Sequence, residues 1–401
     1  MNNGSSINPS HHHHSNFAHE LKEHAQLLLH KVGGFASENA VLCIAAILAV
    51  ATSFIVPPDK AYLDYPDFRT LSCLFGTLAV ICALKNIRFF TYLARKIVCM
   101  TGNMRSASLA LIYITFIGSM LIANDMALLT FLPLGFFVLT ATGNEKYMAR
   151  VFILQNIAAN LGGMLTPFGN PQNLYLYSYF NIPTGEFMKI MLFPFLLSVI
   201  LITACCFLFP KTKLSLTNDK QIELPKKRTL FYLAVFALSI LMVFRVLPYY
   251  IGVVIIFFAI LFTDRDALKK VDYGLLATFF CFFIFSGNLA RIPAVNDLFS
   301  ALLEKNTLIV SALSCQVISN VPSAILLSHF TSDYSALLVG VNIGGAGTLI
   351  ASLASLITFR TYTKYNPGKA LKYIGIFSVY NFAFLIILTL FSSFLIHINF
   401  I

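Results

Sequence analysis

Residues Asn160–Asn173, NLGGMLTPFGNPQN, interrupt a run of apolar residues at a point where a membrane-spanning helix would otherwise continue. Apolar segments flank the stretch over residues 151–159 and 174–180. Glycines, two prolines and amide side chains at membrane depth are tolerated only where irregular backbone is buried in protein or lines a wet cavity. The stretch is therefore predicted to break a helix and to form part of a site.

The pattern recurs at Asn342–Thr348, NIGGAGT, in an equally apolar setting, so that both copies read Asn-(Leu/Ile)-Gly-Gly-x-x-Thr. Interrupted hydrophobic segments at corresponding positions of two halves are a sequence indicator of a transporter substrate site. The alternative for the paired glycines is close packing of helices. The threonine at the same spacing in both copies argues for a further role.

Composition excludes an ordinary soluble globule, because 58% of the 401 residues are hydrophobic and 11% are charged. Soluble domains carry about 25% charged residues, so the chain is predicted to be an all-α polytopic membrane protein. The expected location is a bacterial inner (plasma) membrane. The net charge of +11 comes from lysines and arginines in the loops between apolar segments. This fits the positive-inside rule better than a nucleic-acid partner.

The predicted order divides the chain into a cytoplasmic leader (1–38) with an amphipathic helix over 17–32, a first half (39–209), a cytoplasmic linker (210–228) and a second half (229–401). Spans are expected at 39–56, 69–84, 187–209, 229–247, 249–262, 273–287 and 372–398. Amphipathic segments are expected at 85–96 and 292–303, helical hairpins at 104–140 and 307–330, and broken helices at 151–180 and 335–361.

The first hairpin breaks at Ile122–Asp125, and each of its arms is at or below the roughly 20 residues that cross a bilayer. A re-entrant hairpin is favoured over two conventional spans, because the loop charge on both sides then matches one membrane face. This arrangement puts the N-terminus in the cytoplasm and lets the two hairpins enter from opposite faces. The halves are thus predicted to be inverted repeats, as in many secondary transporters.

Each break is predicted to begin a half-helix, with caps at Asn124–Asp125, Thr166, Asn170 and Asn320. Half-helix N-termini attract anions without Lys or Arg, and unwound carbonyls and hydroxyls suit sodium. The predicted substrate-binding residues are Asn124, Thr166, Asn170, Asn173, Ser319, Asn320 and Thr348. The predicted ion-coupling residues are Asn124, Asp125, Asn160, Gly162, Gly163, Asn320, Asn342, Gly344, Gly345 and Thr348. Further pocket candidates are Gln155, Asn156, Gln172, Ser323 and Ser352.

For any single asparagine, a helix–helix hydrogen bond is the simpler interpretation, but four breaks in two matched pairs favour a site. Asp125 is the one acidic residue that this topology places deep in the bilayer. Intramembrane carboxylates are rare and usually functional, so Asp125 is hypothesised to bind the coupling cation or to carry a proton. The alternative is a plain helix cap.

Two motifs resemble the ion transporter superfamily, which holds divalent-anion/sodium symporters, citrate permeases, ArsB arsenite permeases and NhaD-type antiporters. Ala123–Asp125 with Pro133 in the following apolar arm is similar to the ArsB-side hairpin. Residues Thr166–Asn173 are similar to the signature Thr-Pro-x-Gly-x-Pro-x-Asn. The resemblance runs from about Val41 to the C-terminus. It implies an inverted-repeat scaffold, a homodimer and elevator-like alternating access.

The symporter branch of that superfamily carries Ser-Asn-Thr at both hairpin ends. Here Asn124, Ser319 and Asn320 match that triplet, whereas Ala123, Asp125 and Val321 depart from it. The departures weigh against dicarboxylate binding and in favour of arsenite or antimonite efflux, or of another small inorganic anion.

The chain is therefore expected to be a secondary transporter of a small anion or oxyanion, coupled to Na⁺ or H⁺. The alternatives are an ArsB-like efflux permease and a Na⁺/H⁺ antiporter that uses Asp125. No HExxH motif or Ser/Lys dyad suggests an enzyme, and no nucleotide-binding motif suggests direct ATP drive. No cofactor is expected beyond the coupling ion. The expected partners are a small anionic solute, membrane lipid and a second copy of the chain, without nucleic acid.

Overall fold

The computed structural model describes residues 40–214 and 223–398, and this part of the chain is built from helices. Seven of the described helices are long and apolar enough to cross a membrane. The predicted all-α membrane class is therefore confirmed. The amphipathic helix predicted over 17–32 lies outside the described residues.

The first half has three helices, then a helical hairpin, then the interrupted segment and a last helix. Its elements are α2 (Ala40–Ile55), η1 (Lys60–Leu63), α3 (Phe68–Asn86), α4 (Phe89–Cys99), α5 (Met104–Ile122), α6 (Asn124–Ala141), η2 (Glu145–Tyr147), α7 (Met148–Gly162), η3 (Gly163–Leu165), α8 (Pro171–Tyr179) and α9 (Thr184–Phe207). The expected hairpin is the pair α5 and α6, and the broken helix is the pair α7 and α8.

The second half has the same order after one additional helix. Its elements are α10 (Lys226–Val243), α11 (Tyr249–Thr263), α12 (Arg265–Lys269), α13 (Tyr273–Ala290), α14 (Pro293–Ile318), α15 (Asn320–Leu327), α16 (Tyr334–Ile343), α17 (Leu353–Tyr365) and α18 (Ala370–His397). The hairpin is formed by the later part of α14 with α15, and the broken helix by α16 with α17.

One predicted boundary was wrong. The linker predicted over 210–228 is shorter, because α10 already begins at Lys226. In the second half, the amphipathic segment predicted over 292–303 and the hairpin arm predicted from residue 307 are the two parts of α14, which changes direction between them at Asn306 (φ −167°, ψ 92°). The Asn306 side chain accepts a bond from the Ile309 N–H (2.9 Å), so it restarts the helix as an N-cap does.

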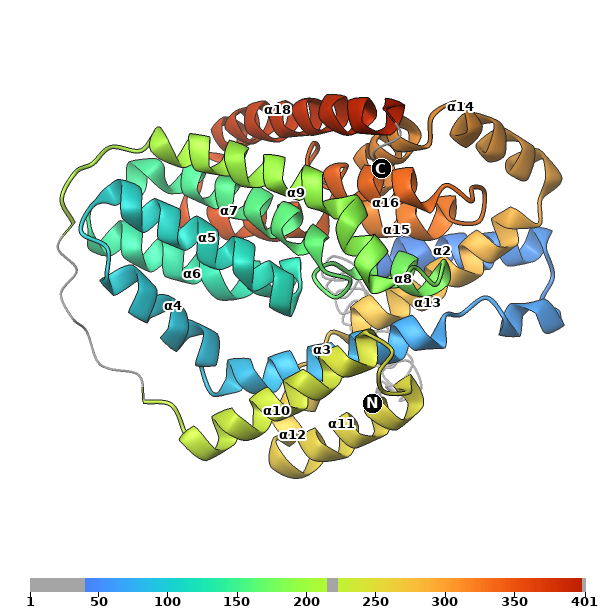
Figure 1. The fold of residues 1–401 in the computed structure, drawn as a ribbon, viewed down its shortest axis with the longest axis horizontal. Coiled ribbons are helices and arrows are strands. Elements are labelled where there is room, and N and C mark those ends of the chain that lie inside the picture. Colours follow the sequence, from blue (N-terminus) through green and yellow to red (C-terminus); the bar gives the residue numbers. More distant parts are fainter. Residues whose placement is uncertain (1–39, 215–222, 399–401) are drawn as a thin grey trace, which may run out of the picture.

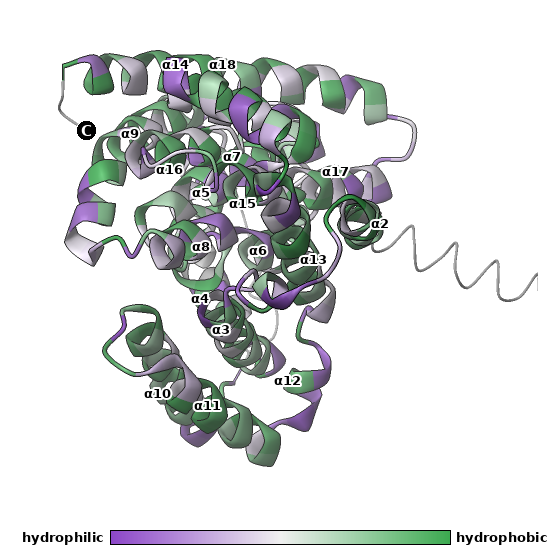
Figure 2. Cartoon of the chain, turned by 90° about the vertical axis from the view of Figure 1, so that its right-hand side faces the viewer, coloured by the Kyte–Doolittle hydropathy of each residue, from purple (hydrophilic) through white to green (hydrophobic). Residues whose placement is uncertain are grey.

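The surface of the helical body suits a lipid environment. Phe54, Val317 and Val379 are 85%, 74% and 70% exposed. Such side chains would be unfavourable in water over a large contiguous surface, but they meet no penalty among acyl chains. Figure 2 shows hydrophobic residues along most of the outer helices and hydrophilic residues gathered in connecting segments.

The helices form two groups. The α3 group comprises α2, α3, α10, α11, α12 and α13, in which α3 packs on α10, α11 and α12, and α2 packs on α13. The hairpin group comprises α5–α9 and the elements from the later part of α14 to α18. Figure 1 shows α3, α10, α11 and α12 together along one edge, with α5, α6, α7 and α9 across from them and α4 leading between the two.

The hairpin group has matching neighbours in both halves. Helix α5 packs on α6 and α7, and α14 packs on α15 and α16. The second arm of each hairpin lies against the broken helix of the other half, α6 on α17 and α15 on α8. The two halves therefore interlock around the helix breaks.

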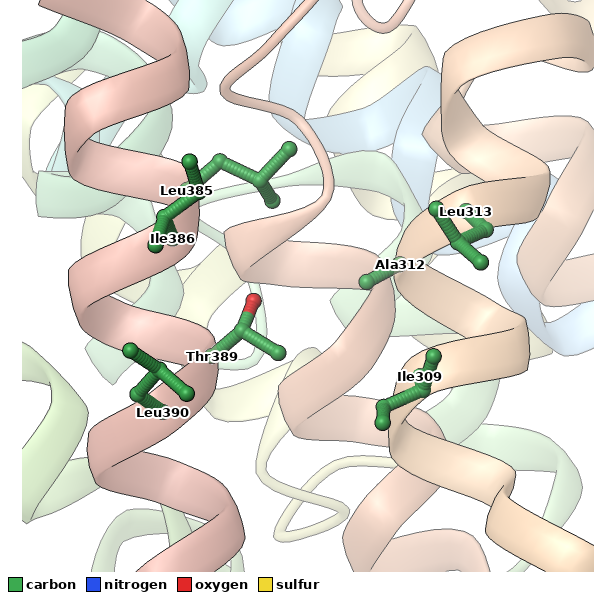
Figure 3. Close-up of a pocket in the computed structure, with 7 residues that line it drawn as sticks. All are labelled: Ile309, Ala312, Leu313, Leu385, Ile386, Thr389 and Leu390. Carbon is green, nitrogen blue, oxygen red and sulfur yellow. The ribbon is translucent and has the colours of Figure 1, made fainter.

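A pocket of about 200 Å³ lies between α14 and α18, lined by Ile309, Ala312 and Leu313 of α14 and by four residues of α18 (Figure 3). Its lining is apolar apart from the Thr389 side chain. Solute sites combine apolar walls with several convergent polar groups, so the pocket does not resemble one.

Candidate transport site

The first hairpin ends at Ala123, a non-glycine residue with positive φ (66°). The Asn124 N–H that follows donates to the Gly169 carbonyl (3.2 Å), in the break between α7 and α8. From the same break, the Thr166 hydroxyl donates to the Met120 carbonyl (2.8 Å). The end of the hairpin, which we call the first tip (residues 123–125), is thus bonded to the interrupted helix from both directions.

The second hairpin repeats these contacts. Ser319 has positive φ (73°), and the Asn320 N–H donates to the Ala351 carbonyl (2.9 Å), in the break between α16 and α17. The Thr348 hydroxyl donates to the Gln316 carbonyl (3.0 Å). In each half the threonine binds the carbonyl four residues before the tip asparagine. The threonines of the repeated motif therefore hold the second tip (residues 319–321) as they hold the first.

Asn160, at the end of α7, joins both broken helices to the first tip. Its Oδ1 accepts a bond from Asn124 Nδ2 (3.1 Å), and its Nδ2 donates to Ser352 Oγ at the start of α17 (3.1 Å). Its carbonyl accepts from Asn170 Nδ2 (3.1 Å). Asn160 is 1% exposed, so these bonds form in a protected interior where an unpaired amide is costly.

Asn342, the counterpart of Asn160 in the second motif, binds the first broken helix. Its Oδ1 accepts from Asn170 Nδ2 (3.1 Å) and Gln172 Nε2 (3.4 Å), and its Nδ2 donates to Asn173 Oδ1 (2.6 Å). Asn173 Nδ2 in turn donates to the Gly163 carbonyl (3.1 Å). Each motif asparagine therefore bonds to the opposite half, and one buried amide network spans both.

Gly162 and Gly344 let the hairpin arms approach the broken helices. A Cβ on Gly162 would lie 2.3 Å from the Phe116 carbonyl oxygen of α5. A Cβ on Gly344 would lie 3.0 Å from the Ala312 Cα of α14. These glycines therefore allow close packing of helices, which was the alternative considered for them. They also mark the helix breaks, because α7 ends at Gly162 and α16 ends just before Gly344.

The second glycine of each pair lies against amide groups of the network. A Cβ on Gly345 would be 3.1 Å from Asn320 Nδ2 and 3.7 Å from Asn160 Oδ1, which brings the second tip to the centre of the network. A Cβ on Gly163 would be 2.3 Å from Asn170 Oδ1. A side chain at either position would displace the polar groups.

Three side-chain oxygens, two from the N-terminal end of α8 and one from a residue of the first tip, are buried and have no hydrogen-bond partner within the described part of the chain. They are Asn170 Oδ1, Gln172 Oε1 and Asp125 Oδ1. Buried acceptors are rarely left unpaired in proteins unless they meet water, an ion or a ligand. Neutral and charged oxygens of this kind are what a hard cation prefers.

The predicted caps at the tips were wrong in detail. Ala123 and Ser319, with positive φ, occupy the positions before α6 and α15, and neither makes a side-chain capping bond. Asn124 and Asn320 are instead the first residues of these helices, and each side chain accepts a bond from the N–H that follows it (2.9 Å in both).

The caps predicted in the first broken helix were also wrong. Thr166 does not start a helix, because α8 begins at Pro171 and the Thr166 hydroxyl is bonded to Met120. Asn170 does precede α8, but its side chain makes no capping bond and turns toward Asn342. In both cases a long-range bond in the buried network replaces a local one.

The further candidates divide between the network and its surroundings. Asn156 Nδ2 donates to Ser355 Oγ of α17 (3.2 Å), beside the network. Gln155 Nε2 donates to Thr115 Oγ1 of α5 (3.0 Å), so it ties the hairpin arm to α7. Ser323 is buried in α15.

Sequence reasoning gave no role to Gln316 and only a secondary one to Ser352. Gln316 Oε1 accepts from the Thr348 N–H (2.9 Å), and Ser352 is both the N-cap of α17 and a partner of Asn160. The position of Ser352 relative to the second motif could have indicated its role. Asn170 follows Asn160 by ten residues, as Ser352 follows Asn342 by ten.

Comparison with known proteins agrees with this architecture. Residues 32–334 match the family model for citrate transporters, CitMHS. An uncharacterized transporter of Methanocaldococcus jannaschii is 35% identical over 315 residues, covering 78% of this chain and 86% of the relative. Inner membrane protein YbiR of Escherichia coli is 28% identical over 321 residues, covering 78% and 85%.

The fold also has a counterpart among solved structures. The YdaH transporter of Alcanivorax borkumensis superposes with a TM-score of 0.51 at 10% identity, covering 90% of this chain and 97% of that chain. At this identity the likeness concerns the fold alone. The family match and the 35% identical relative show that this chain belongs to the citrate transporter family and is an integral membrane transporter.

Proposed function

We propose that this chain is a secondary active transporter of a small anion or oxyanion, coupled to Na⁺ or H⁺ through elevator-like alternating access. The observation that carries the proposal is the buried amide network. In it, two tips and two helix breaks meet through matching contacts from the two halves. On this proposal the halves are inverted repeats, the hairpins enter the inner membrane from opposite faces, the N-terminus is cytoplasmic, and a second copy completes a homodimer.

Four helices begin at the network and support the choice of an anion. They are α6 at Asn124, α8 at Pro171, α15 at Asn320 and α17 at Leu353. Each N-terminus carries free N–H groups and about half a positive charge from the helix dipole. Four such ends directed at one region would bind a negative solute without a lysine or arginine.

The coupling cation would use oxygens of the same region. Asn170 Oδ1, Gln172 Oε1 and Asp125 Oδ1 are buried acceptors that no described hydrogen-bond donor occupies. A sodium ion beside the anion would lower the repulsion that the anion feels from these oxygens. Binding of each ion would then favour the other, which is the thermodynamic basis of symport.

The substrate class within this proposal follows from the family and from the tips. The family model is that of citrate transporters, which puts carboxylates first in a screen. Ala123, Asp125 and Val321 supply no hydroxyl at the tips, so fewer donors would reach a large polyvalent carboxylate. Small oxyanions, with arsenite and antimonite efflux among them, are therefore the second group to test.

Na⁺/H⁺ antiport is a second candidate function, favoured by Asp125. Its backbone lies in the first turn of α6, and one carboxylate oxygen is buried without a described partner. A carboxylate in this position could exchange a proton for a cation without any anionic solute.

The test is a thermal-shift screen of the purified protein against carboxylates and inorganic oxyanions, with and without sodium, followed by uptake into proteoliposomes. Stabilisation by sodium and one anion together, beyond the sum of each alone, would support symport. A response to sodium or pH without any anion would support antiport. Proteoliposomes that move none of these anions, Na⁺ or H⁺ above protein-free liposomes would contradict the proposal.

A further inference from the structure

The α3 group and the hairpin group meet mainly along α8 and α15. Helix α3 lies against α8, and α13 lies against α15. The corresponding elements of the opposite halves are α6 and α17, whose main neighbours are α4, α5, α7, α18 and each other. The contact between the groups is therefore asymmetric, although the hairpin group itself repeats its internal contacts.

The end of α10 contributes two side chains to this boundary. After α10, Arg245 adopts positive φ (63°), which reverses the chain. Its guanidinium donates a hydrogen bond to the Tyr177 carbonyl of α8, and Arg245 Cζ lies 4.1 Å from the centroid of the Tyr177 ring. The neighbouring Phe244 ring packs edge-on against Phe168, with 5.6 Å between centroids.

Phe168 and Tyr177 belong to the moving parts of the proposed mechanism. Phe168 lies in the break between α7 and α8, between the network residues Thr166 and Asn170. Tyr177 is in the last turn of α8, whose first residue is at the network. The four residues, which we call the α10 contact, thus join the α3 group to the interrupted helix that carries the site.

The bond to Tyr177 is one that Arg245 cannot easily replace. In the described part of the chain no carboxylate lies within ion-pair distance of Arg245, whereas Arg291 pairs with Asp59 at 2.7 Å. A guanidinium at the last turn of a helix is favoured by the dipole, and stacking on an aromatic ring adds to this. If α8 moved away, a half-buried cation would lose its partner.

We propose that the α10 contact holds the protein in one of its two access states, closing the passage on the membrane face at which α8 ends. This inference rests on the proposed function, because alternating access requires the hairpin group to move relative to the α3 group. In the other state α8 would leave Arg245, and the passage on that face would open. Arg245 acts through Tyr177 and α8, so it is a positioning residue and not part of the solute site.

The test measures the side from which the second tip can be reached. Val321→Cys, at the half-buried second tip, is placed in a variant whose eight native cysteines have been replaced. Its reaction with a membrane-impermeant maleimide is timed in right-side-out and inside-out vesicles. In the parent, the thiol is expected to react faster from the face opposite the end of α8.

Arg245→Ala is expected to change the ratio of the two labelling rates about tenfold toward the face at which α8 ends. This is the shift expected when one charge-assisted hydrogen bond exists in only one of two states. Arg245→Lys keeps the charge but not the planar stacking, so its ratio should lie between those of Arg245→Ala and the parent. Arg291→Gln is the matched control, because Arg291 also follows a helix of the α3 group but is bonded to Asp59 within that group.

An unchanged ratio in Arg245→Ala, or an equal change in Arg291→Gln, would overturn the inference. The assay uses no substrate, so it separates this inference from the solute assignment. A clear ratio change with no uptake of any tested ion would leave the α10 contact standing and refute the proposed cargo. Equal reactivity from both faces in the parent would overturn the inference, because the α10 contact would then not hold the protein in one access state.

Discussion

Replacing Asn160 by alanine is expected to destabilise the network and to abolish transport. The change removes the Asn160 Oδ1 acceptor of Asn124 Nδ2 and the Asn160 Nδ2 donor to Ser352 Oγ. Asn124 is 3% exposed, and no other bond of its Nδ2 is seen in the described part of the chain, so this amide is left buried and unpaired.

The magnitude follows from these two bonds. Each contributes about 0.5–1.5 kcal/mol net, and an unpaired buried amide costs about 1–3 kcal/mol. Hydrogen bonds between membrane helices average nearer 0.6 kcal/mol, which favours the lower end of the range. Asn160→Ala should therefore lower the free energy of unfolding by about 2–4 kcal/mol.

Asn288→Ala is the matched control for this experiment. Asn288 is also fully buried, and its Nδ2 donates to Thr52 Oγ1 (3.2 Å) and Ser53 Oγ (3.3 Å), within the α3 group. Both hydroxyls keep bonds to carbonyls of their own helix. Asn288→Ala is therefore expected to lower the free energy of unfolding by less than Asn160→Ala does.

Unfolding in detergent gives the stability of each variant, and ion uptake into proteoliposomes gives its activity. The expectation is that both variants are less stable than the parent, and that only Asn160→Ala loses uptake. Normal uptake in a folded Asn160→Ala protein would refute the reasoning that the network is the transport site.

Three more outcomes are expected. Gly162→Ala should destabilise strongly, because its Cβ meets backbone at 2.3 Å, whereas Gly185→Ala has open space and should be nearly neutral in a thermal-unfolding comparison. Asp125→Asn should fold normally yet lose the dependence of uptake on Na⁺ or pH, and retained coupling would exclude a role for the carboxylate. The hydrogen bond from Arg291 holds the pKa of Asp59 below its ordinary value of 3.8, so this pair stabilises the fold above that pH. The stability it contributes is lost as the pH falls below 3.8 through the lowered pKa. In Arg291→Gln, the free energy of unfolding should depend less on pH below 3.8 than it does in the parent. An unchanged pH profile would contradict a stabilising role for the Arg291–Asp59 pair.

Much of the architecture was predictable because unpaired backbone groups and polar side chains are costly inside a bilayer. Glycines, prolines and amides in an apolar run had to mark irregular backbone, and the breaks at Asn160–Asn173 and Asn342–Thr348 lie where the sequence predicted them. The hairpin ends were also predictable, because a polar Asn124–Asp125 step separates two apolar arms. The caps were not, since a local pattern cannot show whether an asparagine serves its own helix or a distant one.

The sequence by itself determined that helices are interrupted, and where, because the cost of unpaired backbone in lipid is a local property of each segment. The tertiary structure alone decided which groups meet at the interruptions. Asn160 bonds to Ser352 and Asn342 bonds to Asn173, across 192 and 169 residues of sequence. The same holds for Arg245 and Tyr177, whose contact depends on how α10 lies against α8. Such pairings form only when the two halves pack together. The local sequence around an amide or guanidinium does not specify which distant group it will bond to.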